Sequence, residues 1–405
     1  MSPFRIIAVV CASQVLVQIG AFAVPALLPV FIDEWALSNT DAGWIISAFY
    51  AAYTLCVPVL VSLTDRIDPK KIYLGSAAFT AIAAIGYALL ADGLWSAMAF
   101  RAMAGIGWAG TYMPGLKALS DFVEGPRQSR AVALHAASVG VSGALSFVIA
   151  GAIADTFGWR WGIALGGAGA ILAFIVMAAM LPGRAPVPSG SRALLDFRPV
   201  LCNRSALAYS LGYMVHTWEM NTLRAWVVTF LVFSAAYSGG GPQWAGPAAV
   251  ATALSLAGIW ASVSGNEIAI RIGRQKFILT VMFASMAMAA MIGFASVLSY
   301  EIVAVLCVMY GVLIWADSAS LTAGAVGSAL PGQRGATLAV HSTLGYGGGF
   351  AGPLVAGLIL DGAGGAGVVA WGLAFASVAA VLTIGPLALF ILRPKDLSGD
   401  RPNAP

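Results

Sequence analysis

The sequence predicts an all-α integral membrane protein, with twelve transmembrane helices in two pseudo-symmetric six-helix bundles. Three observations lead to this fold class. The chain has 405 residues, of which 60% are hydrophobic and only 9% are charged. Soluble domains usually carry about a quarter charged residues, so this chain has too few to cover an ordinary water-facing surface. Long apolar runs recur along the chain, and its second half repeats features of its first.

Twelve runs are long enough to cross a bilayer, because a helix needs about 20 mostly apolar residues to do so. They are 4–32, 43–63, 72–91, 95–116, 132–154, 161–181, 205–233, 247–270, 277–298, 302–326, 336–360 and 368–392. Several exceed the required length, so we expect those helices to tilt or bend. The polar stretch 183–204, rich in Pro, Ser, Gly and Arg, predicts a cytoplasmic linker. We therefore expect a bundle at 1–182, the linker 183–204, and a second bundle with a short cytoplasmic tail at 205–405.

The basic residues orient these spans. Of the 21 Lys and Arg residues, Arg101 and Arg224 lie inside spans and Arg160 lies outside. All the others fall in loops on the side of the N-terminus, which the positive-inside rule assigns to the cytoplasm. Twelve spans with both termini cytoplasmic, in an inner membrane, fit this alternation. The same placement argues against a nucleic-acid partner, because the positive charge marks topology and forms no continuous patch.

An internal repeat divides the chain. At a shift of 206 residues, His135 coincides with His341 and Asp155 with Asp361. A shift of one more residue pairs Trp108 with Trp315. His and Asp are rare here, so these matches carry more weight than those of Ala and Gly. Duplication of a six-span unit predicts a pseudo-twofold axis along the membrane normal and a cavity between the halves.

Three motifs then resemble those of the major facilitator superfamily. The loop after span two keeps Asp65, Arg66 and Lys70 of the family's Gly-x-x-x-Asp-Arg-x-Gly-Arg-Lys signature. It departs from that signature at Val61, Asp68 and Pro69. Residues 101–107 match the Arg-x-x-x-Gly-x-Gly pattern of span four, and 157–161 resemble the segment before span six. The Gly-Pro pair that family antiporters often carry in span five is Gly143-Ala144 here.

The resemblance implies a secondary active transporter that works by alternating access. It also implies that spans one, four, seven and ten line the solute path. The loop signature implies a cytoplasmic gate that latches the halves. Plain positive-inside charge is the alternative for its lysines. The gate residues would be Asp65, Arg66, Lys70, Arg127, Arg130, Arg271 and Arg274.

Four ionisable residues inside spans are candidates for the transport mechanism, because a charge in hydrocarbon is costly unless it is paired or hydrated. They are Arg101, Glu219, Arg224 and Asp317. We expect Glu219 or Asp317 to bind and release a proton as access alternates. Arg224 or Arg101 would then bind a substrate anion or tune that carboxyl. The alternative is a structural ion pair that locks helices together.

Polar uncharged residues complete the predicted substrate and proton pathway. Tyr213 and His216 lie in span seven near Glu219, and His216 can titrate near neutrality, although a structural histidine is the simpler interpretation. Gln14 and Gln18 lie four residues apart, on one face of span one. Such amides bond to a neighbouring helix or to a solute. His135 and His341 are repeat-related, which favours packing or gating.

These features together predict a transporter of a small organic solute. An organic anion is favoured because of Arg224, and coupling to protons is expected. A proton-coupled efflux pump for drugs or metabolites is the alternative. We expect no catalytic residues, no metal, no cofactor and a monomer in the lipid bilayer. A membrane enzyme is disfavoured because the histidines are dispersed and no acid cluster occurs, and a sensor or scaffold because no soluble appendage is present.

Overall fold

The computed structural model describes residues 2–64, 66–123, 126–184, 197–239, 244–330, 333–365, 367–395 and 397. Side chains are described for all of these except 126–130, 132 and 133. Throughout the described ranges the regular structure is helical, with no β-strand. The prediction of an all-α membrane fold is therefore confirmed.

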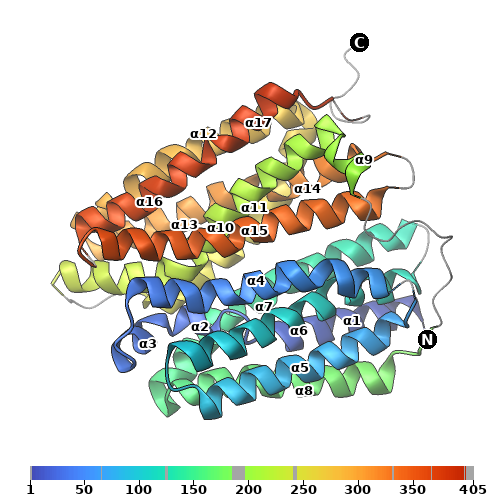
Figure 1. Ribbon diagram of the computed structural model, residues 1–405, viewed down its shortest axis with the longest axis horizontal. Helices are drawn as coiled ribbons and strands as arrows, with labels where there is room; N and C mark the ends of the chain where they lie inside the picture. Colours follow the sequence, from blue (N-terminus) through green and yellow to red (C-terminus); the bar gives the residue numbers. More distant parts are fainter. Residues whose placement is uncertain are drawn as a thin grey trace. The chain divides into compact units, whose positions relative to one another are not determined.

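Seventeen α-helices and one short 3₁₀ helix form the described structure, and Figure 1 labels most of them. They are α1 (Pro3–Gln18), α2 (Ala23–Ala26), α3 (Leu28–Glu34), α4 (Asn39–Leu63), α5 (Pro69–Leu90), α6 (Leu94–Ser120), α7 (Pro126–Phe157), α8 (Trp159–Met180), α9 (Arg198–Leu201), α10 (Arg204–Tyr237), α11 (Pro247–Ile272), α12 (Arg274–Ile292), η1 (Phe294–Val297), α13 (Tyr300–Ala316), α14 (Ser318–Gly327), α15 (Arg334–Gly362), α16 (Val368–Leu382) and α17 (Ile384–Leu392).

Three of the predicted spans are interrupted helices. The first consists of α1, α2 and α3. Pro25 lies in α2 and Pro29 lies in the first turn of α3. Proline favours such interruptions because it lacks the N–H that would continue the hydrogen bonding of a preceding helix. The tenth consists of α13 and α14, which meet at Asp317. The twelfth consists of α16 and α17, which meet at Thr383. The sequence predicted bending in long spans but not these breaks.

Nine stretches of the described residues are long and apolar enough to cross a membrane by themselves. The predicted spans outside this group are the interrupted first span, α6 and α10. Both α6 and α10 exceed the needed length, with 27 and 34 residues, so polarity and not length separates them from the others. Helices that are less apolar than lipid requires must bury their polar side chains in protein or water.

The contacts divide the chain into two compact units. Unit 1 comprises Met1–Ala36 and Ala48–Leu194, and unit 2 comprises Leu37–Ser47 and Leu195–Pro405. In unit 1, α5 packs against α6 and α8, and α1 packs against α7 and α8. The helices approach closely at small residues, and a Cβ built at Gly20 would lie 2.6 Å from the Cα of Gly166. This contact is of the kind that small residues permit between membrane helices.

Unit 2 is organised around α10, which packs against α14, α15 and α17. The pairs α11 with α13 and α12 with α16 complete the bundle (Figure 1). The beginning of α4, from Asn39 to Ser47, also belongs to this unit. Asp361 of α15 accepts hydrogen bonds there from the backbone N–H groups of Asn39 and Thr40, at 3.0 and 2.7 Å. A carboxylate in this position satisfies N–H groups that have no partner within their own helix.

Candidate functional site: a buried polar network in unit 2

Helix α10 carries the polar side chains that the sequence singled out in span seven. It begins at Arg204, where the side chain of Asn203 caps it by accepting from the N–H of Ala206 at 3.2 Å. His216, Glu219 and Asn221 are each at most 2% exposed. A helix with so many buried polar groups is stable in this place only if the neighbouring helices supply partners.

Asp317 supplies the partner of His216. Nδ1 of His216 lies 2.9 Å from Oδ1 of Asp317, and both side chains are almost fully buried. The ring and the carboxylate are not aligned for a hydrogen bond, so the contact is an electrostatic one that depends on protonation of the imidazole. Asp317 reaches α10 from the break between α13 and α14. The sequence named both residues but did not pair them.

Glu219 lies close to this pair, because residues three apart share one face of a helix. Its Oε1 accepts a hydrogen bond from the hydroxyl of Ser285 on α12, at 2.7 Å. The hydroxyl of Tyr310 on α13 is a second polar group beside the carboxyl, and Asp317 is close enough to interact with it electrostatically. Two carboxyl groups and one imidazole thus share a water-poor region of unit 2.

Tyr213 and His341 extend the network towards α15. The two rings are stacked, with centroids 4.0 Å apart, and Tyr213 also stacks on His216 at 5.5 Å. The ring nitrogens of His341 lie 3.4 Å from the hydroxyl of Ser210 and 3.3 Å from that of Thr322. One nitrogen of a neutral imidazole donates and the other accepts, and a hydroxyl can serve either role. Both sides of the His341 ring are therefore satisfied.

Arg224 lies beyond Glu219 along α10. Its guanidinium group lies over the ring of Trp315, 4.4 Å from the centroid. This cation–π contact stabilises a half-buried positive charge. Trp315 lies two residues before Asp317, which caps the C-terminal end of α13. Arg224 packs on Trp315 and His216 contacts Asp317, so both residues of α10 interact with the same end of that helix.

Unit 1 contains the remaining candidates on its own helices. Arg101 of α6 is buried, with its guanidinium 4.5 Å from the ring of Phe49 and Nη1 3.4 Å from the carbonyl oxygen of Ala21. No carboxylate in the described part of the chain pairs with Arg101. Its surroundings are aromatic and neutral, unlike those of His216.

Gln14 and Gln18 are also buried, at 0% and 2% exposed. Neither the amide oxygen nor the amide nitrogen of either side chain has a hydrogen-bond partner among the described residues. Gln14 faces α5 and α6, because a Cβ built at Gly115 would lie 3.4 Å from its Oε1 and 3.3 Å from the ring of Tyr73. The predicted pair of amides on one helix face is thus present, with its hydrogen-bonding capacity unused within unit 1.

His135 resembles His341 in position but not in surroundings. Its ring stacks on Tyr112 with centroids 5.7 Å apart. Neither ring nitrogen has a hydrogen-bond partner among the described residues, and the side chain is fully buried. The repeat-related histidines therefore each stack on a tyrosine, but the two tyrosines come from positions that the repeat does not pair, and only His341 has hydroxyl groups beside its ring nitrogens.

Among the predicted gate residues, Asp65 and the side chains of Arg127 and Arg130 lie outside the described part of the structure. Lys70 donates to the carbonyl oxygens of Ala178 and Leu181 at the end of α8, and Arg274 donates to Asn266 and to the carbonyl oxygen of Ser320. Arg66 and Arg271 are exposed. These contacts of Lys70 and Arg274 each lie within a single unit.

The structure brings Tyr213, His216, Glu219 and Asp317 together. Arg224 lies further along the same helix and packs on Trp315. Sequence reasoning missed Ser285, Tyr310 and Thr322, since one hydroxyl in an apolar helix carries no distinctive signal. Trp315 could have been singled out from the sequence, because the repeat pairs it with Trp108. It is the ring on which Arg224 packs.

Comparisons with known proteins agree with this architecture. The family model of the Major Facilitator Superfamily matches residues 10–353. Protein spinster homolog 1 of Homo sapiens is 25% identical over 251 residues, which are 58% of this chain and 47% of that protein. Monocarboxylate transporter 11 of Homo sapiens is 27% identical over 195 residues, which cover 45% of this chain and 40% of that protein. The match thus spans about half the length of such relatives.

A solved structure shows the same fold over the whole chain. It is the crystal structure of a bacterial homologue of the human lysosomal transporter spinster, in an inward-facing and occupied conformation. The two chains align over 100% of each, with a TM-score of 0.73 and 14% sequence identity. With the family model matched over most of its length, the chain belongs to the Major Facilitator Superfamily and is a multi-pass membrane protein.

Proposed function

We propose that the protein is a secondary active transporter of a small organic anion and that it couples transport to protons through the buried network of unit 2. It would work as a monomer in the inner membrane, with both termini cytoplasmic, by alternating access. The contact between His216 and Asp317, with Glu219 nearby on the same helix, carries this proposal. Ionisable groups this deep in a membrane bundle mark proton or solute pathways by default.

The network has the parts that a proton carrier requires. Burial in a medium of low dielectric disfavours the charged form of a carboxyl, whereas water favours it. A carboxyl that meets water on alternate sides of the membrane would therefore release and rebind its proton during the cycle. Glu219 fits this role because its described partners, Ser285 and Tyr310, are neutral. Asp317 already has a basic partner in His216.

Two arginines within the predicted spans support an anionic substrate. Arg101 is buried and has no carboxylate partner in the described part of the chain, and Arg224 packs on the ring of Trp315. Arginine forms bidentate hydrogen bonds with carboxylates, which suits a small organic acid. The similarity to a protein named monocarboxylate transporter points in the same direction.

A screen followed by a flux measurement tests the proposal. Purified protein would first be tested for thermal stabilisation by organic acids and by cationic drugs. The best ligand would then be added to proteoliposomes that contain a pH-sensitive dye. We expect an organic acid to stabilise the protein and to move protons with it, and Glu219→Gln to abolish the proton movement. Proton-coupled transport of a cationic drug would favour the efflux pump instead, and transport without proton movement would contradict coupling.

A further inference from the structure

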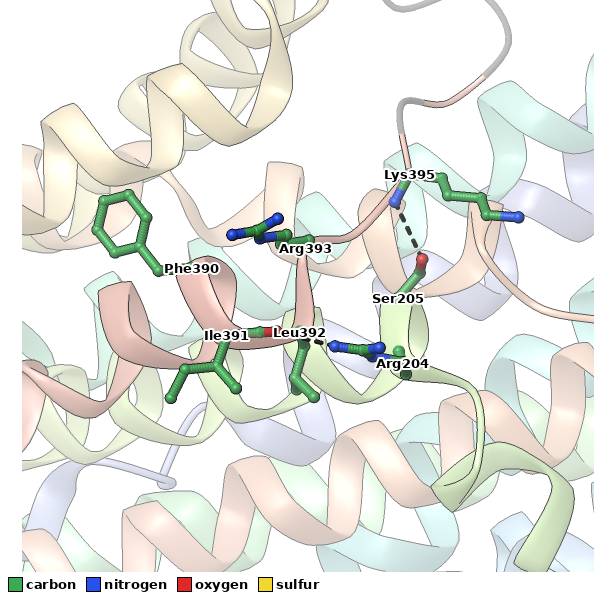
Figure 2. Close-up of a pocket in the computed structure, with 7 residues that line it drawn as sticks. All are labelled: Arg204, Ser205, Phe390, Ile391, Leu392, Arg393 and Lys395. Carbon is green, nitrogen blue, oxygen red and sulfur yellow. Dashed lines mark hydrogen bonds between the residues drawn. The ribbon is translucent and has the colours of Figure 1, made fainter.

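A pocket that the transport network does not use lies where α17 ends and α10 begins. It has a volume of about 580 Å³ and is lined by Arg204, Ser205, Phe390, Ile391, Leu392, Arg393 and Lys395. Three of these seven residues are cationic and none is acidic. Figure 2 shows Phe390 and the guanidinium of Arg393 on one side, Arg204 beneath, and the Lys395 side chain on the other side.

Backbone contacts hold this pocket in shape. Nη2 of Arg204 donates to the carbonyl oxygen of Ile391 at 2.9 Å, and the N–H of Lys395 donates to the hydroxyl of Ser205 at 3.0 Å (Figure 2). Arg393 ends α17 in the left-handed conformation, with φ 46° and ψ 69°. The left-handed conformation is unfavourable for residues other than glycine. The two hydrogen bonds therefore help to hold the turn that follows α17.

The cations have more capacity than the protein uses there. A guanidinium carries five N–H donors and an ammonium three. Among the described residues, Arg204 directs one donor to the carbonyl oxygen of Ile391, and Lys395 hydrogen-bonds through its backbone N–H. The C-terminal end of a helix attracts cations, which would explain charged side chains near the last carbonyl groups of α17. It would not explain why the cations line a pocket.

The pocket also has an apolar side. Phe390 and Ile391 are 52% and 65% exposed, on the last turn of a membrane-spanning helix. In a bilayer this turn lies where acyl chains meet headgroups. The orientation proposed above places it in the cytoplasmic leaflet, and the pocket inference rests on that orientation. Clustered Lys and Arg between helices at this level are typical of sites for anionic lipid headgroups.

We propose that this pocket binds the phosphate-bearing headgroup of an anionic phospholipid, with Arg204, Arg393 and Lys395 around the phosphate and Phe390 and Ile391 against the acyl chains. A free phosphate ion shares the headgroup chemistry but would gain nothing from the exposed apolar turn. The apolar side therefore favours the lipid.

Native mass spectrometry of the full-length protein with phosphatidylglycerol or phosphatidylcholine tests the proposal. The double variant Arg393→Gln with Lys395→Gln keeps the Arg204 contact and the backbone bond of Lys395. We expect it to weaken phosphatidylglycerol binding about tenfold or more, since each cation near a membrane surface contributes to anionic lipid binding. Lys276→Gln is the matched control, because Lys276 is an exposed cation at the start of α12 outside the pocket. It should bind like the parent.

Three results would overturn the proposal. One is equal binding of phosphatidylglycerol by the double variant and the Lys276→Gln control. Another is displacement of the bound lipid by inorganic phosphate or glycerol phosphate. In that case the soluble phosphate would also stabilise the parent protein against thermal unfolding, and this stabilisation would disappear in the double variant. That second result would assign the pocket to a soluble phosphate. Equal binding of the two lipids by the parent protein would likewise contradict a headgroup site.

Discussion

Units 1 and 2 share a duplicated plan but bury different kinds of polar side chain. Within the described residues, both buried carboxyl groups, Glu219 and Asp317, are in unit 2. Unit 1 buries Arg101, His135 and the two amides Gln14 and Gln18. The comparison teaches that duplication fixed the helical scaffold, whereas the chemistry of each half diverged. Unit 2 thus holds both of these carboxyl groups, whereas unit 1 buries a guanidinium, an imidazole and two amides.

The repeat-related histidines show the same divergence on a smaller scale. Each stacks on a tyrosine, Tyr112 in unit 1 and Tyr213 in unit 2. Only His341 has hydroxyl groups near both ring nitrogens. The two arginines within predicted spans are more alike, since Arg101 packs on Phe49 and Arg224 packs on Trp315.

Removing the carboxyl of Glu219 should have the largest effect on transport. Glu219→Gln keeps the size of the side chain and can still bond to Ser285, but it cannot release a proton. We expect accumulation driven by a pH gradient to fall to the level seen without a gradient, while the protein elutes as a folded species in size-exclusion chromatography. Solute accumulation as steep as in the parent would exclude Glu219 as the proton carrier. Gln14→Leu in unit 1 is the comparison variant, and it should leave any remaining flux responsive to the gradient.

The buried contact of His216 with Asp317 should give the largest effect on stability. Either His216→Gln or Asp317→Asn leaves one polar partner buried and unmatched, so each should lower the free energy of unfolding by about 2–4 kcal/mol. The double variant should lose about 1–3 kcal/mol less than the sum of the two. Denaturant titration of purified protein in detergent measures these values. Strictly additive losses would show that the two groups do not interact.

Replacing the buried amides of unit 1 should raise the free energy of unfolding rather than lower it. Gln14→Leu or Gln18→Leu removes polar atoms that have no partner in the described part of unit 1 and keeps most of the volume. Because an unmatched buried polar group costs about 1–3 kcal/mol, each variant should raise the free energy of unfolding by about 1 kcal/mol and lower the rate of transport. Gln275→Leu, at the start of α12, is the comparison variant, and it should lower stability instead because the amide of Gln275 donates to the carbonyl oxygen of Leu389 at 3.5 Å. Loss of stability in the Gln14 and Gln18 variants would mean that the amides hold unit 1 together instead.

The smallest expected effect is a difference in stability between variants of His341 and His135. His341→Phe keeps the stacking on Tyr213 but leaves Ser210 and Thr322 without their ring partner, which should cost about 1 kcal/mol of stability. His135→Phe keeps the stacking on Tyr112 and removes no described hydrogen bond, so it should change stability by less. Thermal unfolding of the two variants side by side measures the difference. Equal losses would contradict the distinction between the units.

Much of the fold could be predicted from the sequence because membrane spans are encoded locally, by the length of apolar runs and by the placement of Lys and Arg. The rarity of charges in spans was enough to select Glu219, Arg224 and Asp317. The partners could not be predicted in the same way. Ser285 lies 66 positions beyond Glu219, and only the packing of α12 against the bundle brings its hydroxyl within 2.7 Å.

The breaks in the first and tenth spans were equally hard to predict. Pro25 and Pro29 are visible signals in the first span, yet membrane helices often contain proline without ending there, as Pro58 does within α4. At Asp317 the sequence has no proline or glycine. The end of α13 at this residue is set by tertiary contacts, and it is also what presents the carboxylate to His216.

Infrared difference spectroscopy of the protein in lipid, between about pH 5 and about pH 8, tests the central claim most directly and needs no substrate. If unit 2 holds the exchangeable proton, the parent and Gln14→Leu will both show the carbonyl band of a protonated carboxyl that changes with pH. Glu219→Gln will lack that band. A band of unchanged size in Glu219→Gln, or no pH-dependent carboxyl band in the parent, would contradict the assignment of proton exchange to this network.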